Sequence, residues 1–534
     1  MAPKVGGTEP GDEHDFAIPF EGVRRLLQKY RNRDPDKVAL VDLDQEKSIT
    51  FGQLHEEANR IARRLHAMGA QKGDRIAMLS DERLEKLILW VGIWRAGAVV
   101  AAPNVEMNIA YISEILRAVK PKITLWSEEL EVATITDGVG GDIVKFSNWE
   151  ADSAGDAKSD EFFAQVAAEP AAPELDVDYG PDDICSIYCT SGTTDKPKIF
   201  ANSHMSHWSF GLCSIDQTGV GSEDKTLEYR SFGWSSAQGM SLMAWLITGC
   251  TLHFARHFSH RRFAGWIIDN GITFSVGVPT VINMLINKPL DETGKNFPTL
   301  RVMSSSTAPL SPDRWNRFEA MYGIKLLQMY GTSEGGWICG NRDYHSRMGT
   351  VGPPAKHQEF LIVDENGERC PPGVEGEVTL GGPQCAVAEI TYDGEWHNIK
   401  GKRMHLGDLA VMDEDGFVTV TGRLKDLIIR GGVNISPMEL DNVLLRERRI
   451  LEAAAVGVPD DIYGEEVVCY VVPKPGEDLT EADVRAHCDA LLPAFRRPKE
   501  IHFIDEIPKS DRGKVKRDAL KARWLESRQA HWDA

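Results

Sequence analysis

The chain has 534 residues, 42% of them hydrophobic and 26% charged, so it is too long for one hydrophobic core and should divide into several domains. Acidic residues outnumber basic ones by 80 to 60, and the formal charge of -20 argues against nucleic acid or anionic lipid as a partner. The nine cysteines include no CxxC pair, which favours reduced thiols over a disulfide framework or a zinc site.

The N-terminal half alternates between helical and strand patterns. Apolar residues recur every three or four positions over residues 54–68, and Gly69 follows as a stop signal, which predicts an amphipathic helix. The stretches "DRIAMLSD" (74–81) and "AGAVVAAPN" (96–104) read as strands on either side of an apolar helix at 87–94. This order predicts an α/β architecture with doubly wound sheets. The apolar run 87–94 is too short to span a membrane and the N-terminus has no signal-peptide pattern, so we expect a soluble cytoplasmic protein.

A hydroxyl-rich loop follows a surface connection that we expect over residues 150–183. A strand ends within "SIYCTSGTTDKPK" (186–198). The small and hydroxyl residues that follow it are Thr190, Ser191, Gly192, Thr193 and Thr194. Lys196 and Lys198 add positive charge to the same loop. Closely spaced backbone N–H groups beside a glycine suit phosphate oxygens. An ordinary Ser/Thr turn explains the same residues, and the spacing is not that of a Walker A loop.

The pattern changes near residues 422–426. Beyond that point the strands "AAAVGVP" (453–459) and "EVVCYVVP" (466–473) precede a helix that Thr480 should cap, with Asp483 three residues on. This indicates a separate small domain of mixed type.

Five motifs in one order resemble those of the adenylate-forming superfamily, which includes acyl-CoA synthetases, adenylation domains of peptide synthetases and beetle luciferases. They are "YCTSGTTDKPK" (188–198), "SSSTAPL" (304–310), "YGTSEGG" (330–336), "GDLAVMDEDGFVTVTGRLKDLIIRGGVNISPMEL" (407–440) and "PKSDRGKVKRDAL" (508–520). The resemblance implies an α/β fold with a large N-terminal domain, 1–424, that has doubly wound sheets and a smaller β subdomain. It also implies a small mobile α+β C-terminal domain, 425–534, that turns about a hinge at Lys425.

The resemblance assigns roles in nucleotide binding. Residues that match the family's nucleotide site are the loop residues above with Lys198, then Thr307, Ala308, Pro309, Tyr330, Gly331, Ser333, Asp408 and Arg423. Asp408 would bind the ribose hydroxyls with Arg423 as its cationic companion, although a surface ion pair is the simpler explanation for both. Tyr330 would lie against the purine, or it is a core tyrosine with a satisfied hydroxyl. The family usually has threonine at the positions of Ser333 and Leu406, so this chain departs from the pattern twice.

Three residues match the family's reacting groups. Thr332 would contact the α-phosphate, and Glu334 would bind Mg²⁺, which prefers oxygen ligands. Lys514 would bridge the carboxylate and the α-phosphate, because a movable cation offsets the repulsion between two anions. The alternative for Lys514 is a solvated lysine within a basic run.

The acyl and thiol sites are less clearly marked. The resemblance places Gly431 and Gly432 at the pantetheine tunnel, although both could serve a simple turn. It draws the acyl pocket from Trp234, Ser235, Gly277, Val278, Pro279, Ser305 and Gly331. Acetate-using relatives have tryptophan where this chain has Gly331, so an acid larger than acetate is expected. Serine hydroxyls and Gln238 suggest that this acid is polar or hydroxylated.

We therefore expect a carboxylic acid:CoA ligase that forms an acyl-adenylate from MgATP and then an acyl-CoA. ATP, Mg²⁺ and coenzyme A enter as substrates, no tightly bound organic cofactor is expected, and a homodimer is left open. One alternative is a stand-alone enzyme that loads an amino or aryl acid onto a carrier protein. Gly233, where amino-acid-activating relatives carry aspartate, disfavours an amino acid. Two further alternatives are an oxygenating relative and a non-catalytic adenylate-binding regulator.

Overall fold

The computed structural model describes residues 18–130, 134–151, 155–190, 196–290, 297–509 and 514–532. Ser191, Gly192, Thr193 and Thr194 of the predicted phosphate loop lie outside the described residues. None of the described helices is both long enough and apolar enough to cross a membrane.

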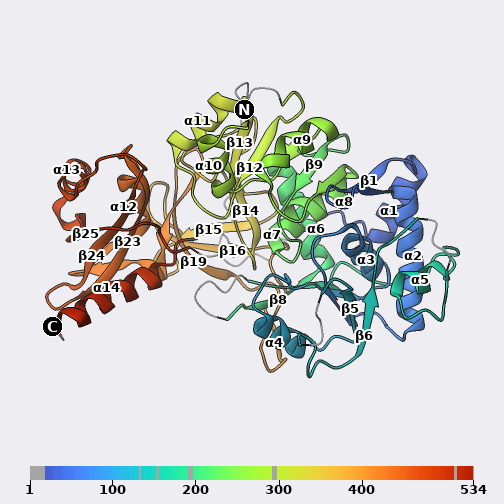
Figure 1. The fold of residues 1–534 in the computed structure, drawn as a ribbon. Coiled ribbons are helices and arrows are strands. Elements are labelled where there is room, and N and C mark those ends of the chain that lie inside the picture. Colours follow the sequence, from blue (N-terminus) through green and yellow to red (C-terminus); the bar gives the residue numbers. More distant parts are fainter. Residues whose placement is uncertain are drawn as a thin grey trace.

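Two eight-stranded sheets with helices between them form the main body (Figure 1). The first sheet runs in the order β14 (Gly336–Gly340), β13 (Lys325–Thr332), β12 (Val302–Ser305), β11 (Phe274–Ser275), β9 (Lys225–Glu228), β10 (Thr251–Phe254), β1 (Val38–Asp42) and β2 (Lys47–Thr50). The second runs in the order β18 (Trp396–Asn398), β17 (Ala388–Ile390), β8 (Ile199–Ser203), β7 (Ile184–Cys189), β4 (Val99–Ala101), β3 (Arg75–Leu79), β5 (Ile123–Ser127) and β6 (Asp142–Phe146). Most neighbouring strands at the centre of both sheets are parallel, as the predicted doubly wound order requires.

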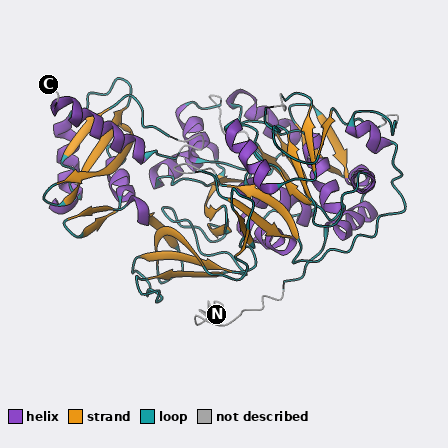
Figure 2. Ribbon diagram, turned by 90° about the horizontal axis from the view of Figure 1, so that it is seen from below, coloured by secondary structure: helices purple, strands orange, loops and turns teal. Residues whose placement is uncertain are grey.

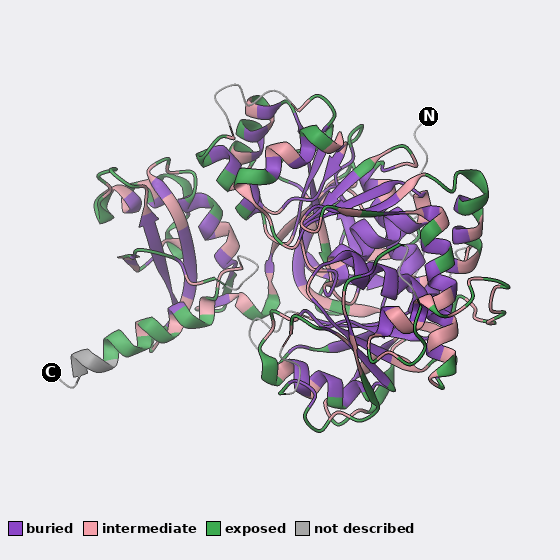
Figure 3. Cartoon of the chain, turned by 45° about the vertical axis from the view of Figure 1, so that its right-hand side comes forward, coloured by how far each residue is buried: buried purple, intermediate pink, exposed green. Residues whose placement is uncertain are grey.

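The helices of the main body cover and join these sheets. They are α1 (Val23–Arg33), α2 (Phe51–Ala67), α3 (Leu84–Arg95), α4 (Ile109–Val119), α5 (Phe162–Ala167), α6 (His204–Thr218), α7 (Ser235–Ala237), the π-helix η1 (Gln238–Met243), α8 (Ala244–Thr248), α9 (His260–Asn270), α10 (Pro279–Asn287) and α11 (Pro312–Tyr322). Every residue of α3 is buried, and one core cluster joins this helix to Ile76 of the second sheet and Leu227 of the first. Figure 3 shows the buried residues concentrated in the sheets and in the helices between them.

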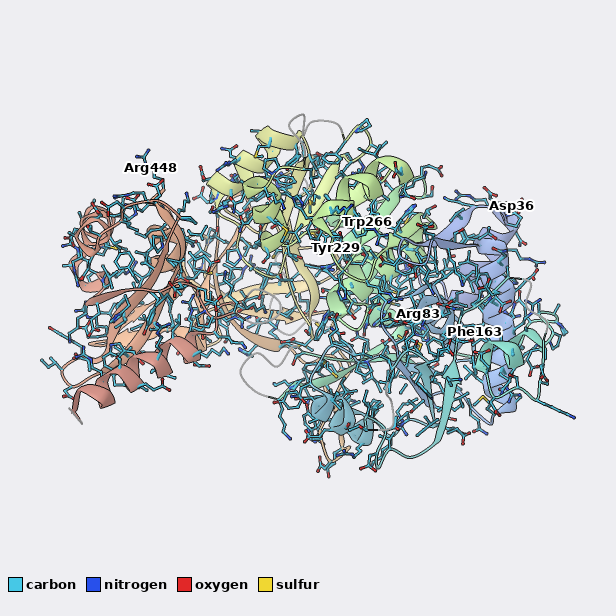
Figure 4. All side chains as sticks on the ribbon, in the orientation of Figure 1. Asp36, Arg83, Phe163, Tyr229, Trp266 and Arg448 are labelled. Carbon is cyan, nitrogen blue, oxygen red and sulfur yellow. The ribbon has the colours of Figure 1, made fainter. Side chains whose placement is uncertain are left out.

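Charged residues at the start of α3 are buried as pairs. Arg83, labelled in Figure 4, donates to Glu85 at 3.0 Å, and Lys86 donates to Glu82 at 2.6 Å. Buried charges persist in a protein only when they are paired in this way. These four charged side chains are therefore held away from solvent by partners of opposite charge.

The predicted helix at 54–68 and strand at 74–81 correspond to α2 and β3, and Gly69 adopts a positive φ of 85° after the helix. The stretch 150–183 differs from the expected surface connection, because it contains α5. Phe162, Phe163 and Val166 of α5 are buried, and the helix packs against α2 (Figure 4 labels Phe163). Its six residues are too few to set up a readable helical period.

A smaller antiparallel sheet follows the main body. It consists of β15 (Glu359–Val363), β16 (Gly376–Gly381), β19 (Met404–Met412) and β20 (Val418–Arg423). It corresponds to the predicted β subdomain, and Figure 2 shows it beside the two large sheets.

The C-terminal unit has its own sheet and its own core. Its strands are β21 (Ile428–Arg430), β22 (Val433–Ile435), β23 (Ile450–Asp460), β24 (Gly464–Pro473) and β25 (Glu500–Phe503), and its helices are α12 (Pro437–Leu444), α13 (Glu481–Leu491) and α14 (Arg517–Trp532). Figure 1 shows this unit to the left of the main body, beside the strands β15 and β19. The predicted capping box is present: Asp483 N donates to Thr480 Oγ1 at 3.2 Å, and Thr480 N donates to the Asp483 carboxylate at 3.0 Å.

Candidate active site

The candidate site begins at one edge of the first sheet. β9, β11, β12 and β13 are parallel neighbours, so their carboxyl ends meet at the same edge. Ligands of open α/β sheets bind outside the carboxyl ends of such strands. Three sequence motifs, at 277–279, 304–310 and 330–336, begin at these ends.

Three of the predicted nucleotide residues form one hydrogen-bonded group. The Tyr330 hydroxyl donates to Asp408 Oδ2 at 2.6 Å, and Arg423 Nε donates to Asp408 Oδ1 at 2.8 Å. The Asp408 side chain is 4% exposed, whereas the Arg423 side chain is 41% exposed. Burial and the Asp408 charge raise the pKa of Tyr330, so this hydroxyl remains protonated and continues to donate. The ion pair expected as the simpler explanation exists, but its carboxylate is buried at the carboxyl end of β13 rather than on the surface.

The ladder between β19 and β20 explains this pairing. Asp408 and Arg423 are opposite residues of the two antiparallel strands. Cross-strand neighbours lie close enough for their side chains to meet. Asp408 and Arg423 are fifteen residues apart in the sequence, and this spacing alone does not reveal that they are paired across the two strands.

The segment that should line the adenine is held in an unusual conformation. Thr307 has a φ of 75°, a region that β-branched residues rarely adopt. The Ala308 carbonyl accepts a hydrogen bond from Gln328 Nε2 at 3.1 Å, and Pro309 is exposed. Strained backbone of this kind persists where the surrounding structure holds it, often at binding sites. Gln328 was not identified from the sequence; the signal that could have found it is a polar side chain within the buried strand "KLLQMY".

The "YGTSEGG" segment continues β13 into β14. Thr332 Oγ1 accepts a hydrogen bond from Gly335 N at 3.0 Å, which leaves its O–H free to act as a donor. The Glu334 carbonyl accepts from Ala386 N at 2.9 Å, and the Glu334 and Ser333 side chains are half-buried. Thr332 and Glu334 therefore lie on one short turn at the same sheet edge as Tyr330.

The two ends of the predicted phosphate loop are tied together. Thr190 N donates to the Lys198 carbonyl at 2.9 Å, and Lys198 N donates to Thr190 Oγ1 at 2.9 Å. Lys196 points elsewhere, because its ammonium group pairs with Glu114 at 2.8 Å and lies over the Tyr392 ring. Lys198 remains two-thirds exposed, at 4.0 Å from Glu389.

Glycines fix the backbone around the predicted acyl site. A Cβ on Gly233 would lie 2.7 Å from Asn104 N, so the aspartate of amino-acid-activating relatives does not fit here without a backbone shift. A Cβ on Gly277 would lie 2.2 Å from the Ser304 carbonyl oxygen, and Gly277 N donates to Ser304 Oγ at 3.0 Å. Val278 and Pro279 lead into α10, and Trp234 and Ser235 lead into α7. Ser305 is buried at the end of β12.

The glycine pair at 431–432 forms the two-residue turn between β21 and β22. Both residues have positive φ, 58° for Gly431 and 81° for Gly432, as a tight hairpin of this type requires. The turn expected as the simpler explanation is therefore confirmed. Lys425 is exposed in a short 3-10 turn, Leu424–Asp426, and Lys514 is half-buried just before α14.

These features define an α/β protein with a separate C-terminal unit. The family model described as "AMP-binding enzyme" matches residues 27–388, and that of the "AMP-binding enzyme C-terminal domain" matches residues 439–514. The chain belongs to this family of AMP-binding enzymes, within its acyl-CoA synthetase branch.

Individual relatives cover nearly the whole chain. The oxalate–CoA ligase of Arabidopsis thaliana is 30% identical over 533 residues, which cover 94% of this chain and 98% of the relative. The sulfoacetate–CoA ligase of Cupriavidus necator is 30% identical over 513 residues, which cover 93% and 97%. The crystal structure of ATP-bound MatB from Rhodopseudomonas palustris matches with a TM-score of 0.83 at 26% identity, covering 94% of this chain and 99% of that one.

Proposed function

We propose that this enzyme joins a carboxylic acid to coenzyme A in two steps at one site. In the first step a carboxylate oxygen bonds to the α-phosphorus of MgATP, and the bond from that phosphorus to pyrophosphate breaks. In the second step the thiolate of coenzyme A bonds to the acyl carbon, and the bond from that carbon to AMP breaks. The products are an acyl-CoA, AMP and pyrophosphate.

The observation that carries this proposal is the buried Asp408 carboxylate with its two donors. A carboxylate at this position can accept hydrogen bonds from both ribose hydroxyls, while Arg423 offsets its charge and Tyr330 offers an aromatic face to the purine. Such a group holds the nucleotide at the carboxyl edge of the sheet. The α-phosphate then comes to the turn that carries Thr332 and Glu334.

The phosphate groups need donors and a metal ligand. The Thr332 hydroxyl accepts from Gly335 N, and its remaining proton can be donated to an α-phosphate oxygen. Mg²⁺ is commonly held by one or two carboxylates together with substrate phosphates, so the single carboxylate of Glu334 suits an ion that arrives with ATP. Thr190 and Lys198 hold the base of the loop that would enclose the remaining phosphates.

The acid and the thiol require different partners. In the first step Lys514 would lie between the carboxylate and the α-phosphate, because a cation there offsets the repulsion between the two anions. The lysine must then leave, so that the thiol can reach the acyl carbon. We assign that exchange to rotation of residues 425–534 about Lys425, which brings the turn at 431–432 to the site.

The test measures the release of AMP and pyrophosphate from ATP in the presence of each of a panel of carboxylic acids, with and without coenzyme A. We expect acid-dependent pyrophosphate exchange without coenzyme A, and stoichiometric AMP and acyl-CoA when it is present. Transfer to a phosphopantetheine carrier but not to coenzyme A would instead favour the carrier-loading alternative. ATP binding without turnover of any acid would favour the regulator.

The substitution Lys514→Ala separates the two steps. Adenylate formation should fall by about three orders of magnitude, which corresponds to about 4 kcal/mol of lost transition-state stabilisation. Attack of coenzyme A on a supplied acyl-adenylate should change by less than about threefold. Lys516→Ala, in the same basic run, is the matched control, and equal losses in both steps would reject the role of Lys514.

A further inference from the structure

The ring of Phe210 lies between two glycines at the candidate site. Phe210 is 2% exposed on α6, and a Cβ on Gly239 of η1 would lie 2.4 Å from its Cε2 atom. A Cβ on Gly336, the first residue of β14, would lie 2.9 Å from its Cδ2 atom. Contacts this short leave no room for a side chain at either position, so both elements meet the ring with bare backbone.

Gly336 ends the turn that carries Thr332 and Glu334. It has a φ of 71°, a conformation that favours glycine, and it pairs with Thr332 across the β13–β14 ladder. The ring of Trp337, the next residue, lies 6.4 Å from the Phe210 ring. Phe210 therefore supports the turn from below, at a point two residues after Glu334.

The other side of the turn is also held. A Cβ on Gly335 would lie 2.6 Å from Cδ2 of Leu380, a buried residue of β16. The Glu334 carbonyl accepts a hydrogen bond from Ala386 N at 2.9 Å. The turn is thus packed between the β subdomain and the Phe210 ring. A closely packed segment of this kind shifts when one of its neighbours changes volume.

The helix that carries Phe210 is fixed to β14 at a second place. Asp216, near the other end of α6, pairs with Arg342, which follows β14, and both side chains are nearly buried. A Cβ on Gly340, at the end of β14, would lie 2.5 Å from Cδ of Gln217. The position of α6 is therefore set independently of the turn. The turn has to fit against a ring that is already in place.

We propose that Phe210 is a positioning residue for adenylate formation. Its ring holds the turn so that the Thr332 hydroxyl and the Glu334 carboxylate face the place where the α-phosphate and its metal ion would lie. Misplacing a reacting group by about 1 Å can lower a rate about a hundredfold, so a buried ring behind the turn can affect the chemical step. The inference rests on the proposed function and adds to it a residue that acts through its neighbours.

The first measurement compares kcat and KM for pyrophosphate exchange in Phe210→Leu and the wild type. The acid is the one that supports the fastest exchange in the wild-type enzyme. The smaller side chain frees space beside Gly336, so kcat should fall about tenfold to a hundredfold. KM for ATP should change by less than about threefold, because Asp408 and Tyr330 keep their hydrogen bond. Phe210→Met fills more of the space and replaces Phe210→Leu if that variant does not fold.

A double-mutant cycle separates positioning from a general loss of stability. Thr332→Ala removes the hydroxyl that Phe210 would position. The fall in kcat caused by Phe210→Leu should therefore be at least about fivefold smaller in the Thr332→Ala background than in the wild type. Effects of the two substitutions that simply multiply would overturn the inference.

Phe318→Leu is the matched control. Phe318 is 1% exposed on α11, and its ring centre lies 5.0 Å from that of Tyr322. This substitution should change kcat by less than about threefold. Urea midpoints should fall in both variants, so that lower stability alone does not explain a lower kcat.

Two outcomes are distinguished by the wild-type enzyme. Equal falls of kcat in Phe210→Leu and Phe318→Leu, with acid-dependent exchange in the wild type, would reject only the present inference. Absence of acid-dependent pyrophosphate exchange in the wild type, with every acid of the panel, would reject the proposed function itself.

Discussion

The Asp408 carboxylate is buried, charged and hydrogen-bonded to two side chains. It accepts from Tyr330 and Arg423, and it lies nearly buried at the junction of the first large sheet and the β subdomain. Hydrogen bonds to an ionised group are stronger than those between neutral groups, and a buried charge is costly once its partners are lost. The residue is therefore sensitive to substitutions that keep its shape and remove its charge.

The substitution Asp408→Asn tests that sensitivity. We expect KM for ATP to rise about tenfold to a hundredfold, the range that corresponds to the loss of about 1.5–3 kcal/mol from a charge-assisted hydrogen bond. Tyr330→Phe, which removes only one donor, should raise KM by less. Steady-state kinetics at saturating acid gives the measurement, and an unchanged KM for ATP in Asp408→Asn would remove the residue from the nucleotide site.

Two buried histidines make the fold sensitive to acid. Burial lowers the pKa of His207 to about 3 and that of His204 to about 4, and neither ring nitrogen of His207 has a partner in the described ranges. In the unfolded chain a histidine titrates near pH 6.5. Below that pH the unfolded state binds protons that the folded state does not, so stability falls as the pH drops toward the folded values.

His207→Phe should reduce this loss. The ring of His207 lies edge-on to Trp94 at 5.8 Å, a contact that phenylalanine can keep. Each histidine contributes a slope of about 1.4 kcal/mol per pH unit, so the variant should lose about 2 kcal/mol less than the wild type between pH 7 and pH 5. Urea midpoints at both pH values provide the measurement, with His397→Gln on the exposed strand β18 as the control. An equal fall of the urea midpoint between pH 7 and pH 5 in the wild type and in His207→Phe would show that His207 does not cause the acid sensitivity.

Among the elements, α13 shows how local sequence sets a boundary. Thr480 and Asp483 satisfy two backbone donors of the first turn, in the arrangement that their spacing predicts. Val484 and Cys488 then turn the buried face of the helix toward the sheet.

Thr480→Ala should weaken this helix by about 1 kcal/mol, because one first-turn amide loses its acceptor. Thr480→Ser keeps the acceptor and should cost less. Hydrogen exchange of the α13 amides in the full chain measures the effect. Faster exchange in α13 with little change in α12 is expected, and equal protection in Thr480→Ala and wild type would show that the cap contributes nothing.

The regular elements were accessible to sequence reasoning, whereas contacts across strands were not. The apolar spacing of α2 and the nearly continuous apolar runs of α3, β23 and β24 were sufficient to predict these elements. The π-helix η1 had no such signal, because it depends on its packing against α6 and β14. The pairs Asp408–Arg423 and Gly331–Trp337 follow from strand register, which one sequence does not state. For that reason the motif residues could be named in advance, whereas the pairs that strand register forms could not.

At the scale of the whole molecule, two bodies are joined near residues 424–426. The C-terminal sheet has its own apolar clusters, and the two family matches end at 388 and begin at 439 on either side of this connection. We take Lys425 as the pivot between them.

Lys425→Pro tests that pivot. Proline fixes φ near -65°, so the C-terminal unit should no longer rotate about this residue and should remain in one arrangement. We expect pyrophosphate exchange within about threefold of wild type and a loss of acyl-CoA formation of at least about a hundredfold. Lys425→Ala keeps the backbone freedom and is the matched control. Overall turnover unchanged in Lys425→Pro would place the pivot elsewhere.

The order of residues at the end of β20 has a mechanical consequence. Arg423 is the last residue of that strand and binds Asp408, while the next peptide unit already belongs to the turn of Leu424–Asp426. A ligand in front of Asp408 would therefore act on Arg423, which lies two residues from Lys425, the proposed pivot of the C-terminal unit. We therefore expect nucleotide release and rotation of the C-terminal unit to be coupled through Arg423.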